Sequence, residues 1–235
     1  MKNDPREEIV VLWTSLPIPN DDLDAVARAM VTAEERREAD AFRIARDRSR
    51  FLQRRAFRRR MVADLLGAPP GDIAFGTGDF GQPSVTAPGR WHLSASARAD
   101  LAVVAVGGQG PFGIDLELPR TGRDIAALVA TVFSPFDPIL PFDGRGPEAE
   151  RLFHDLWTAK EAVLKALGTG LRHDPAALTW RPAEDTVEPV PGSPDIGTWR
   201  LRRPLIRADA YFAVATRTDR EIPLAAPVRV DWPQA

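Results

Sequence analysis

The sequence contains no cysteine, which is the most informative of its absences. A disulfide framework, a thiolate nucleophile and a Cys-ligated zinc or iron–sulfur site are therefore excluded. The chain also has no long hydrophobic run, because its longest uncharged apolar stretch, 101–112, is interrupted by glycines and is too short to cross a bilayer. Residues 1–8 have no apolar core of the kind that a signal peptide needs. We therefore expect a cytoplasmic protein with no membrane partner.

Lysine is the second scarcity. It occurs only at Lys2, Lys160 and Lys165, so arginine supplies the other 28 of the 31 cationic side chains. The 33 acidic residues outnumber these cations and give a net charge of −2. A negative net charge disfavours general binding to polyanions, so we expect no nucleic-acid partner. Two of the three lysines lie five residues apart, which makes the segment around them a candidate site.

The rest of the composition is that of a soluble globular protein, with 44% hydrophobic and 27% charged residues among 235. Helical patterns cover 32–66, 121–133 and 147–167. The first has Thr32 and Glu35 at the spacing of a capping box and a break expected near 45–49. Strand patterns are predicted at 10–14, 72–75, 91–94, 101–106, 112–118, 177–181, 198–203, 211–217 and 228–232.

This order of elements indicates an α+β fold. Each half of the chain pairs a long helix with a small, mostly antiparallel sheet, and the change from one half to the other is expected near 107–111. We therefore predict two similar subdomains, at 1–108 and 109–235.

The first segment that could carry chemistry is the strand 112–118, with the sequence Phe-Gly-Ile-Asp-Leu-Glu-Leu. Side chains alternate along a strand, so Asp115 and Glu117 share one face with Cα atoms roughly 7 Å apart. Two carboxylates at that separation can bind one divalent cation such as Mg²⁺. The alternative is an ordinary strand whose polar face lies in water.

The second segment is the helix 152–168, in which Glu161 and Lys165 lie opposite an apolar stripe. Their spacing of four residues is also that of a simple surface ion pair, so a structural reading stays open. His154 is expected on the polar face of the same helix. Gly168 and Gly170 follow, and glycines at a helix exit allow backbone to approach a ligand closely.

The third segment, 43–60, holds nine arginines and one acid, Asp47. Arginine binds phosphate with two parallel hydrogen bonds, so part of this helix could hold a small polyphosphate ligand or an acidic protein partner. A nucleic-acid interface is the alternative, which the negative net charge and the few aromatic residues disfavour. Other arginines in the segment are expected to form a solvated helix face.

Together these segments resemble a known family. Gly-Ile-Asp-Leu-Glu, at 113–117, followed by Trp-Thr-Ala-Lys-Glu-Ala-Val-Leu-Lys-Ala-Leu-Gly-Thr-Gly, at 157–170, resembles the bipartite signature of the 4′-phosphopantetheinyl transferases. The resemblance is to the long, pseudo-dimeric class similar to surfactin-synthetase-associated transferases. It extends to the basic helix around Arg46 and Arg55…Arg59, to Phe-Gly-Gln-Pro at 80–83 and to His-Leu-Ser-Ala-Ser at 92–96.

The resemblance implies a fold of two subdomains related by a pseudo-twofold axis and an enzyme that acts as a monomer. Such enzymes transfer the 4′-phosphopantetheine of coenzyme A to a serine of an acyl or peptidyl carrier protein, and they release adenosine 3′,5′-bisphosphate. Their Mg²⁺ positions fall on Asp115, Glu117 and Glu161. Catalysis falls on Asp115, Glu161 and Lys165, where the lysine meets the pyrophosphate. Contacts with coenzyme A fall on Arg46, Arg55, Gln82, Ser94, Ala95, Lys160 and Lys165.

Two positions depart from the family pattern. Gln82 stands where the family commonly has lysine, and Ala95 stands where it has histidine. Both family residues bind the 3′-phosphate of coenzyme A, and each such charge-assisted contact contributes about 1.5–3 kcal/mol. Neighbouring arginines such as Arg90 and Arg98 are candidates to replace them. The alternative function is a degenerate homologue that binds carrier proteins with weak or no transfer, which the intact acidic residues and Lys165 disfavour.

Overall fold

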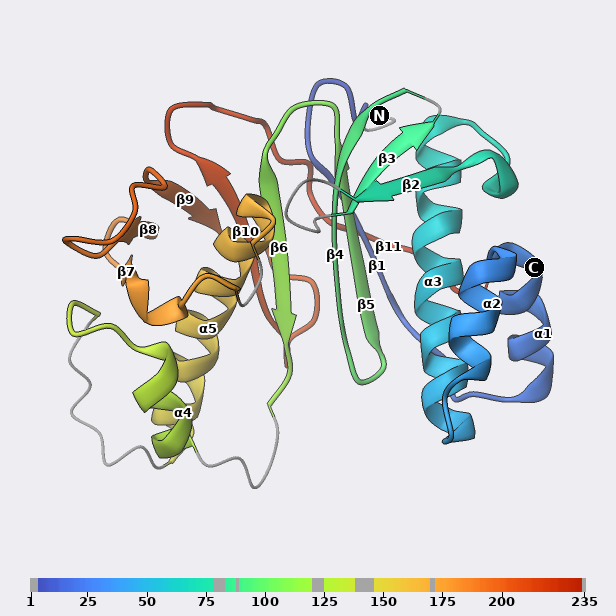
Figure 1. Cartoon of the computed structure of the whole chain (residues 1–235), viewed down its shortest axis with the longest axis horizontal. Helices are drawn as coiled ribbons and strands as arrows, with labels where there is room; N and C mark the ends of the chain where they lie inside the picture. Colours follow the sequence, from blue (N-terminus) through green and yellow to red (C-terminus); the bar gives the residue numbers. More distant parts are fainter. Residues whose placement is uncertain are drawn as a thin grey trace.

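The computed structural model describes residues 4–77, 83–87, 89–119, 125–137, 146–169 and 172–233. Two sheets pack face to face and helices cover their outer sides, so four layers follow one another across the molecule (Figure 1). Nearly all pairings between the described strands are antiparallel, and the exception is β1 with β11. The predicted α+β class is confirmed. No helix in the described part of the chain is long and apolar enough to cross a membrane.

The first layer consists of three helices, α1 (Asp21–Met30), α2 (Ala33–Asp40) and α3 (Ala45–Leu66). The capping box before α2 forms as predicted, because the Glu35 amide donates to the Thr32 hydroxyl at 3.1 Å and the Thr32 amide donates to the Glu35 carboxylate at 3.1 Å. Gly67 ends α3 in the left-handed conformation that glycine adopts freely. The break between the helices precedes Ala45, earlier than expected, and α1 was not predicted.

The second layer is a six-stranded sheet in the order β11-β1-β5-β4-β3-β2. Its strands are β1 (Val10–Ser15), β2 (Ala74–Thr77), β3 (Pro83–Ala87), β4 (Trp91–Arg98), β5 (Leu101–Gly107) and β11 (Val228–Arg229). One face packs on α3 in an apolar core that includes Leu52, Phe57 and Val104. Although β11 comes last in the sequence, it lies parallel to β1 at the edge of this sheet, so the predicted 109–235 subdomain sends one strand back to the other half.

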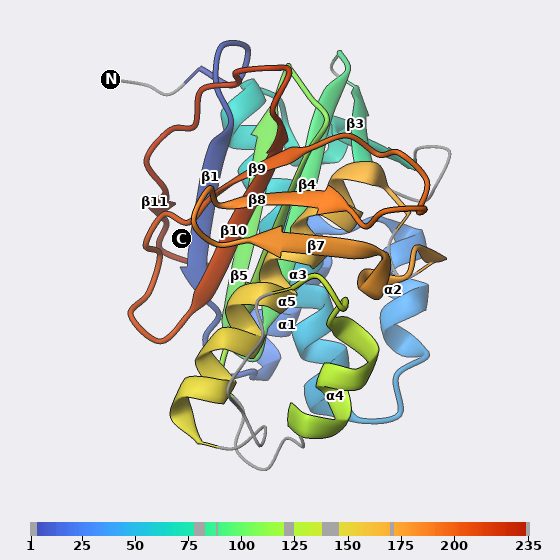
Figure 2. The ribbon, with the colours of Figure 1, turned by 90° about the vertical axis from the view of Figure 1, so that its left-hand side faces the viewer.

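The third layer is a five-stranded sheet in the order β6-β10-β9-β8-β7. It consists of β6 (Phe112–Glu117), β7 (Leu178–Arg181), β8 (Thr186–Pro189), β9 (Trp199–Arg202) and β10 (Tyr211–Arg217). Figure 2 shows that β7 and β8 run across the direction of β1, whereas β9 pairs antiparallel with β10. The fourth layer is α5 (Pro147–Leu167) with α4 (Ile125–Val132) beside it, and it packs on this sheet through Phe153, Leu156 and Val163.

The two sheets meet in a third apolar core. Val11 and Val103 of the first sheet pack there with Ile114, Leu116 and Val214 of the second. Because β6 is an edge strand of its own sheet and lies against β4, the two halves of the chain form one continuous structure at this place. The strands on either side of this contact carry the residues of the candidate site.

Candidate functional site

Gly113 lets β6 lie directly against α5. A Cβ atom at this position would lie 2.1 Å from the carbonyl oxygen of Ala162 and 2.5 Å from the amide nitrogen of Ala166, and no side chain fits at such distances. The glycine of the Gly-Ile-Asp-Leu-Glu segment therefore allows the strand and helix backbones to touch. That contact brings the two segments singled out in the sequence together.

β4 reaches β6 with every second side chain. The Ile114 amide donates to the Ser94 hydroxyl at 3.0 Å, the Ser96 hydroxyl donates to Asp115 Oδ1 at 3.0 Å, and Arg98 Nε lies 3.0 Å from Glu117 Oε2. An edge strand has backbone groups without partners in its sheet, and the Ser94 hydroxyl satisfies one of them here. The prediction that Ser94 contacts a cofactor receives no support from this arrangement, since its side chain is buried between the sheets.

Asp115 and Glu117 are both buried, with 5% and 7% of their surface exposed. The alternative of a strand with its polar face in water is therefore wrong, because β4 and α5 cover that face. Lys165 Nζ donates to Asp115 Oδ1 at 2.6 Å and to the Ser96 hydroxyl at 3.1 Å. The ion pair between Lys165 and Asp115 thus joins α5 to β6 and involves a third residue from the other half of the chain. Ser96 was not predicted as a site residue, although the serine-rich strand motif contains it.

Glu161 is the second acid of this cluster on α5. Burial raises its pKa to about 7, and the negative charges of Asp115 and then Glu117 act in the same direction, while Lys165 opposes them. Glu161 lies on α5, which packs directly against β6, and repulsion from the carboxylates of that strand favours its protonated form. Within the described residues, Glu161 Oε1 and Asp115 Oδ2 are buried and have no hydrogen-bond partner. Two buried carboxylate oxygens without partners are suited to a cation.

The donor set fits a hard divalent cation by its chemistry, since all three side chains offer oxygen atoms. In the described part of the chain, no three His, Cys, Asp or Glu side chains already surround one point in the geometry of a metal site. Instead, Lys165 and Arg98 each lie against one of the carboxylates. These two cations balance the acidic cluster in this conformation.

A cavity of about 690 Å³ lies between α3 and the strands β4 and β5. This volume is within the usual range for a site that binds a small molecule. Its wall is dominated by arginines from one face of α3, opposite small residues of the sheet: Arg46, Arg50, Arg54, Arg55, Arg58, Ala95, Ser96 and Ala97. Ser96 of β4 contributes to this wall, and its hydroxyl contacts Asp115 and Lys165, so the cavity and the carboxylate cluster share this strand.

The cavity arginines are held by the backbone as well as by acids. Arg50 donates to the carbonyl oxygens of Leu16 and Pro17, at 3.1 and 2.9 Å, and Arg54 donates to that of Ala99 at 3.1 Å. Burial lowers the pKa of both guanidinium groups, and each remains cationic at neutral pH. Cations that are partly buried and fixed in position form a ready site for an anion.

Lys160 lies apart from this cluster. Its ammonium is completely buried and donates to the Val132 carbonyl at 2.8 Å and to Asp137 Oδ2 at 2.6 Å. Asp137 also accepts from the amides of Ser134 and Trp180, so the pair ties the segment after α4 to α5 and β7. The predicted contact of Lys160 with a cofactor is incompatible with this position, and Lys160 has a structural role.

The other predicted residues divide into three groups. Arg46, Arg55 and Ala95 line the cavity together, as expected for residues that bind one ligand. Arg98 is paired with Glu117, which makes it a poor replacement for a missing phosphate ligand. Gln82 lies outside the described residues.

Comparison with known proteins adds independent findings. Residues 111–205 match the family model described as the 4′-phosphopantetheinyl transferase superfamily. The chain is 30% identical over 197 residues to the 4′-phosphopantetheinyl transferase HetI of Nostoc sp., a match that covers 77% of this chain and 83% of the relative. It is also 32% identical over 145 residues to the 4′-phosphopantetheinyl transferase of Bacillus subtilis, and this match covers 61% and 62% of the two chains. A third relative, 4′-phosphopantetheinyl transferase psf-1 of Bacillus pumilus, is 30% identical over 67% of this chain and 66% of its own length.

Proposed function

The chain belongs to the 4′-phosphopantetheinyl transferase superfamily, and we propose that it transfers the phosphopantetheine group of coenzyme A to a serine of an acyl or peptidyl carrier protein. One observation supports the assignment to particular residues: β4 carries Ala95 and Ser96 of the arginine-lined cavity, and the Ser96 hydroxyl bonds to Asp115 and Lys165 of the buried cluster. A ligand with phosphates at two places, such as coenzyme A, can use both parts of this site at once.

In this proposal the cavity arginines bind the phosphates of coenzyme A. Arg46, Arg55 and Ala95 all line this cavity, and Ala95 stands where the family has a histidine. Lys165 faces the pyrophosphate and stabilises the negative charge that grows as the bond to the departing bisphosphate breaks. The nucleophile is the serine hydroxyl of the carrier protein.

Asp115, Glu117 and Glu161 would hold a Mg²⁺ ion. Such an ion supplies positive charge against the pyrophosphate in the transition state. The support is the pair of buried oxygens without partners on Asp115 and Glu161, together with the raised pKa of Glu161. Binding of the cation would require Glu161 to lose its proton and would compete with Lys165 and Arg98 for the carboxylates.

We also propose that the protein acts as a monomer in the cytoplasm. A monomer fits because one chain supplies both the arginine cavity and the acidic cluster. The absence of cysteine is compatible with a reducing compartment.

The decisive experiment is incubation with coenzyme A, Mg²⁺ and several apo carrier proteins, followed by mass spectrometry of the carriers. The expected product is a carrier that has gained one phosphopantetheine on its serine. A carrier that binds the protein but never gains mass would favour the degenerate homologue instead. Omission of Mg²⁺ and addition of a chelator test the metal separately.

A further inference from the structure

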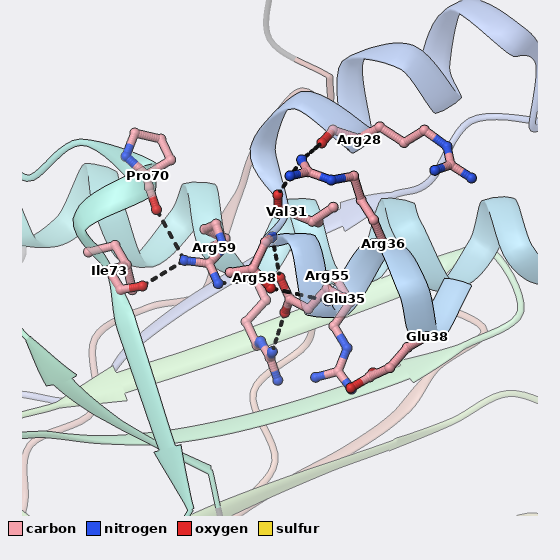
Figure 3. A network of polar contacts seen from close by, with 11 residues as sticks. Arg28, Val31, Glu35, Arg36, Glu38, Arg55, Arg58, Arg59, Pro70 and Ile73 are labelled. Carbon is pink, nitrogen blue, oxygen red and sulfur yellow. Dashed lines mark hydrogen bonds and ion pairs between the residues drawn. The ribbon is translucent and has the colours of Figure 1, made fainter. Parts of the chain in front are cut away.

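Helix α2 lies alongside α3 and brings two carboxylates to the arginines of the cavity wall. Figure 3 shows Glu35 directed at Arg58 and Arg59, and Glu38, one turn later, directed at Arg55. Arg55 and Arg58 both line the cavity, so these acids partly neutralise cations that a phosphate would use. The two acids do so in very different surroundings.

Glu35 is a structural residue. It is buried, and its Oε2 accepts from the Thr32 amide at 3.1 Å and from Arg59 Nη2 at 3.3 Å, while its Oε1 accepts from Arg58 Nη2 at 3.3 Å. Arg59 continues inward and donates to the carbonyl oxygen of Ile73 at 2.6 Å. Removing Glu35 would leave the largely buried guanidinium groups of Arg58 and Arg59 without their carboxylate partner and would destabilise the fold.

Glu38, in contrast to Glu35, is not buried. Its side chain is 48% exposed, and its Oε2 lies 3.5 Å from Arg55 Nη2, which belongs to a side chain 33% exposed. Arg55 is also held from another side, because its guanidinium lies 4.9 Å from the centre of the Phe51 ring. Arg55 can therefore keep its place at the cavity without Glu38, and the ion pair is loose enough to be replaced by a stronger anion.

We propose that Glu38 is an affinity-determining residue that competes with the phosphates of coenzyme A for Arg55. The inference rests on the proposed function, because it takes coenzyme A as the occupant of the cavity. A phosphate offers a guanidinium more charge and better hydrogen-bond geometry than a carboxylate at 3.5 Å does, so the phosphate displaces Glu38 from Arg55. The affinity for coenzyme A is lowered because its binding has to break the ion pair between Glu38 and Arg55.

The test measures the dissociation constant of coenzyme A by titration calorimetry. Glu38→Gln keeps the shape of the side chain and removes its charge, and we expect coenzyme A to bind about two- to five-fold more tightly, the range set by a partly exposed ion pair. Glu34→Gln is the matched control, because Glu34 is exposed on the same helix and loses the same charge. It should change the affinity by much less.

A double-mutant cycle with Arg55→Gln shows whether Glu38 acts through Arg55. The gain from Glu38→Gln should vanish when Arg55 is already replaced. Equal gains in both backgrounds, or an equal gain in Glu34→Gln, would overturn the proposal and leave only a general effect of charge. If wild-type protein binds no coenzyme A at all, the proposed function fails first, whereas binding that Arg55→Gln weakens and Glu38→Gln leaves unchanged refutes the role of Glu38 alone.

Discussion

The two long helices use charge in opposite ways. α3 carries eight arginines, five of which line a single cavity, and several are held by more than one neighbour. α5 has only three cations, of which Lys160 and Lys165 each make one short, buried or half-buried ion pair. Charge is therefore redundant on the N-terminal side of the site and irreplaceable on the C-terminal side. A single substitution should be tolerated on α3 and costly around α5.

The largest effect is expected from Asp115→Ala. Asp115 accepts hydrogen bonds from Lys165 and Ser96, and its second buried oxygen is a proposed metal ligand, so its loss removes two hydrogen bonds and that ligand together. We expect the rate of transfer to a carrier protein, followed by mass spectrometry, to fall by about a thousand-fold or more. Circular dichroism should show an intact fold. Glu184→Ala, which removes an exposed acid from a turn, is the control and should keep its rate; a loss of less than about ten-fold in Asp115→Ala would contradict the assignment.

The two lysines of α5 form a matched pair for the next comparison. Lys165→Met should lower the transfer rate about a hundred-fold with little change in melting temperature, because its ammonium is partly exposed at the site. Lys160→Met should instead lower the free energy of unfolding by about 3 kcal/mol, since it leaves the buried Asp137 without its cation. Thermal melts and rates measured on both variants separate the roles. The reverse pattern would mean that the two assignments are exchanged.

A smaller effect concerns pH. The pKa of Glu161 is raised from 4.5 to about 7, so the metal-free folded protein binds this proton more tightly than the unfolded chain does. The free energy of unfolding, measured relative to Glu161→Gln, should therefore fall as the pH rises from about 4.5 to about 7. Mg²⁺ should bind about ten-fold more tightly at pH 8 than at pH 6, because only the ionised carboxylate is a ligand. Calorimetric titration with Mg²⁺ at both pH values checks this, and an affinity independent of pH would remove Glu161 from the metal site.

A gain of similar size is expected where a cation is added on the N-terminal side of the site. Ala95→His restores the family residue at the cavity wall and should tighten coenzyme A by about ten-fold at a pH where the imidazole is protonated, with little gain for 3′-dephospho-coenzyme A. Gln82→Lys tests the other departure in the same assay. Equal gains for both ligands would show that these positions do not face the 3′-phosphate.

Local signals in the sequence predicted much of the fold correctly. The capping box at Thr32, the end of the first helical segment at Leu66 and the helix from Pro147 to Leu167 depend on contacts within a few residues, and such contacts can be read directly from the sequence. Two strands, β3 and β8, were missed because each is short and receives its order from neighbouring strands.

The site was predicted only in part, because some of its contacts join elements that are distant in the sequence. Asp115, Glu161 and Lys165 were expected together, and Lys165 does bond to Asp115, but the spacing could not show which lysine of α5 faces the carboxylate cluster. Lys160 turns to Asp137, a partner on a distant loop. His154 was expected on a polar face and is instead buried with its ring stacked 4.9 Å from that of Tyr211. The positions of these side chains depend on burial by elements that are distant in the sequence, and the periodicity of one helix cannot predict such contacts.

The return of β11 to the first sheet has a consequence for the order of events during synthesis. Val228 and Arg229 pair with β1, the Val230 amide donates to the Trp13 carbonyl at 2.8 Å, and the Trp232 ring packs edge-on against Phe57 of α3 at 5.7 Å. The ribosome makes these residues after every other strand of that sheet. Helix α3 therefore cannot pack on its complete apolar core until this segment has been translated. The N-terminal half is synthesised first, but its core is completed last.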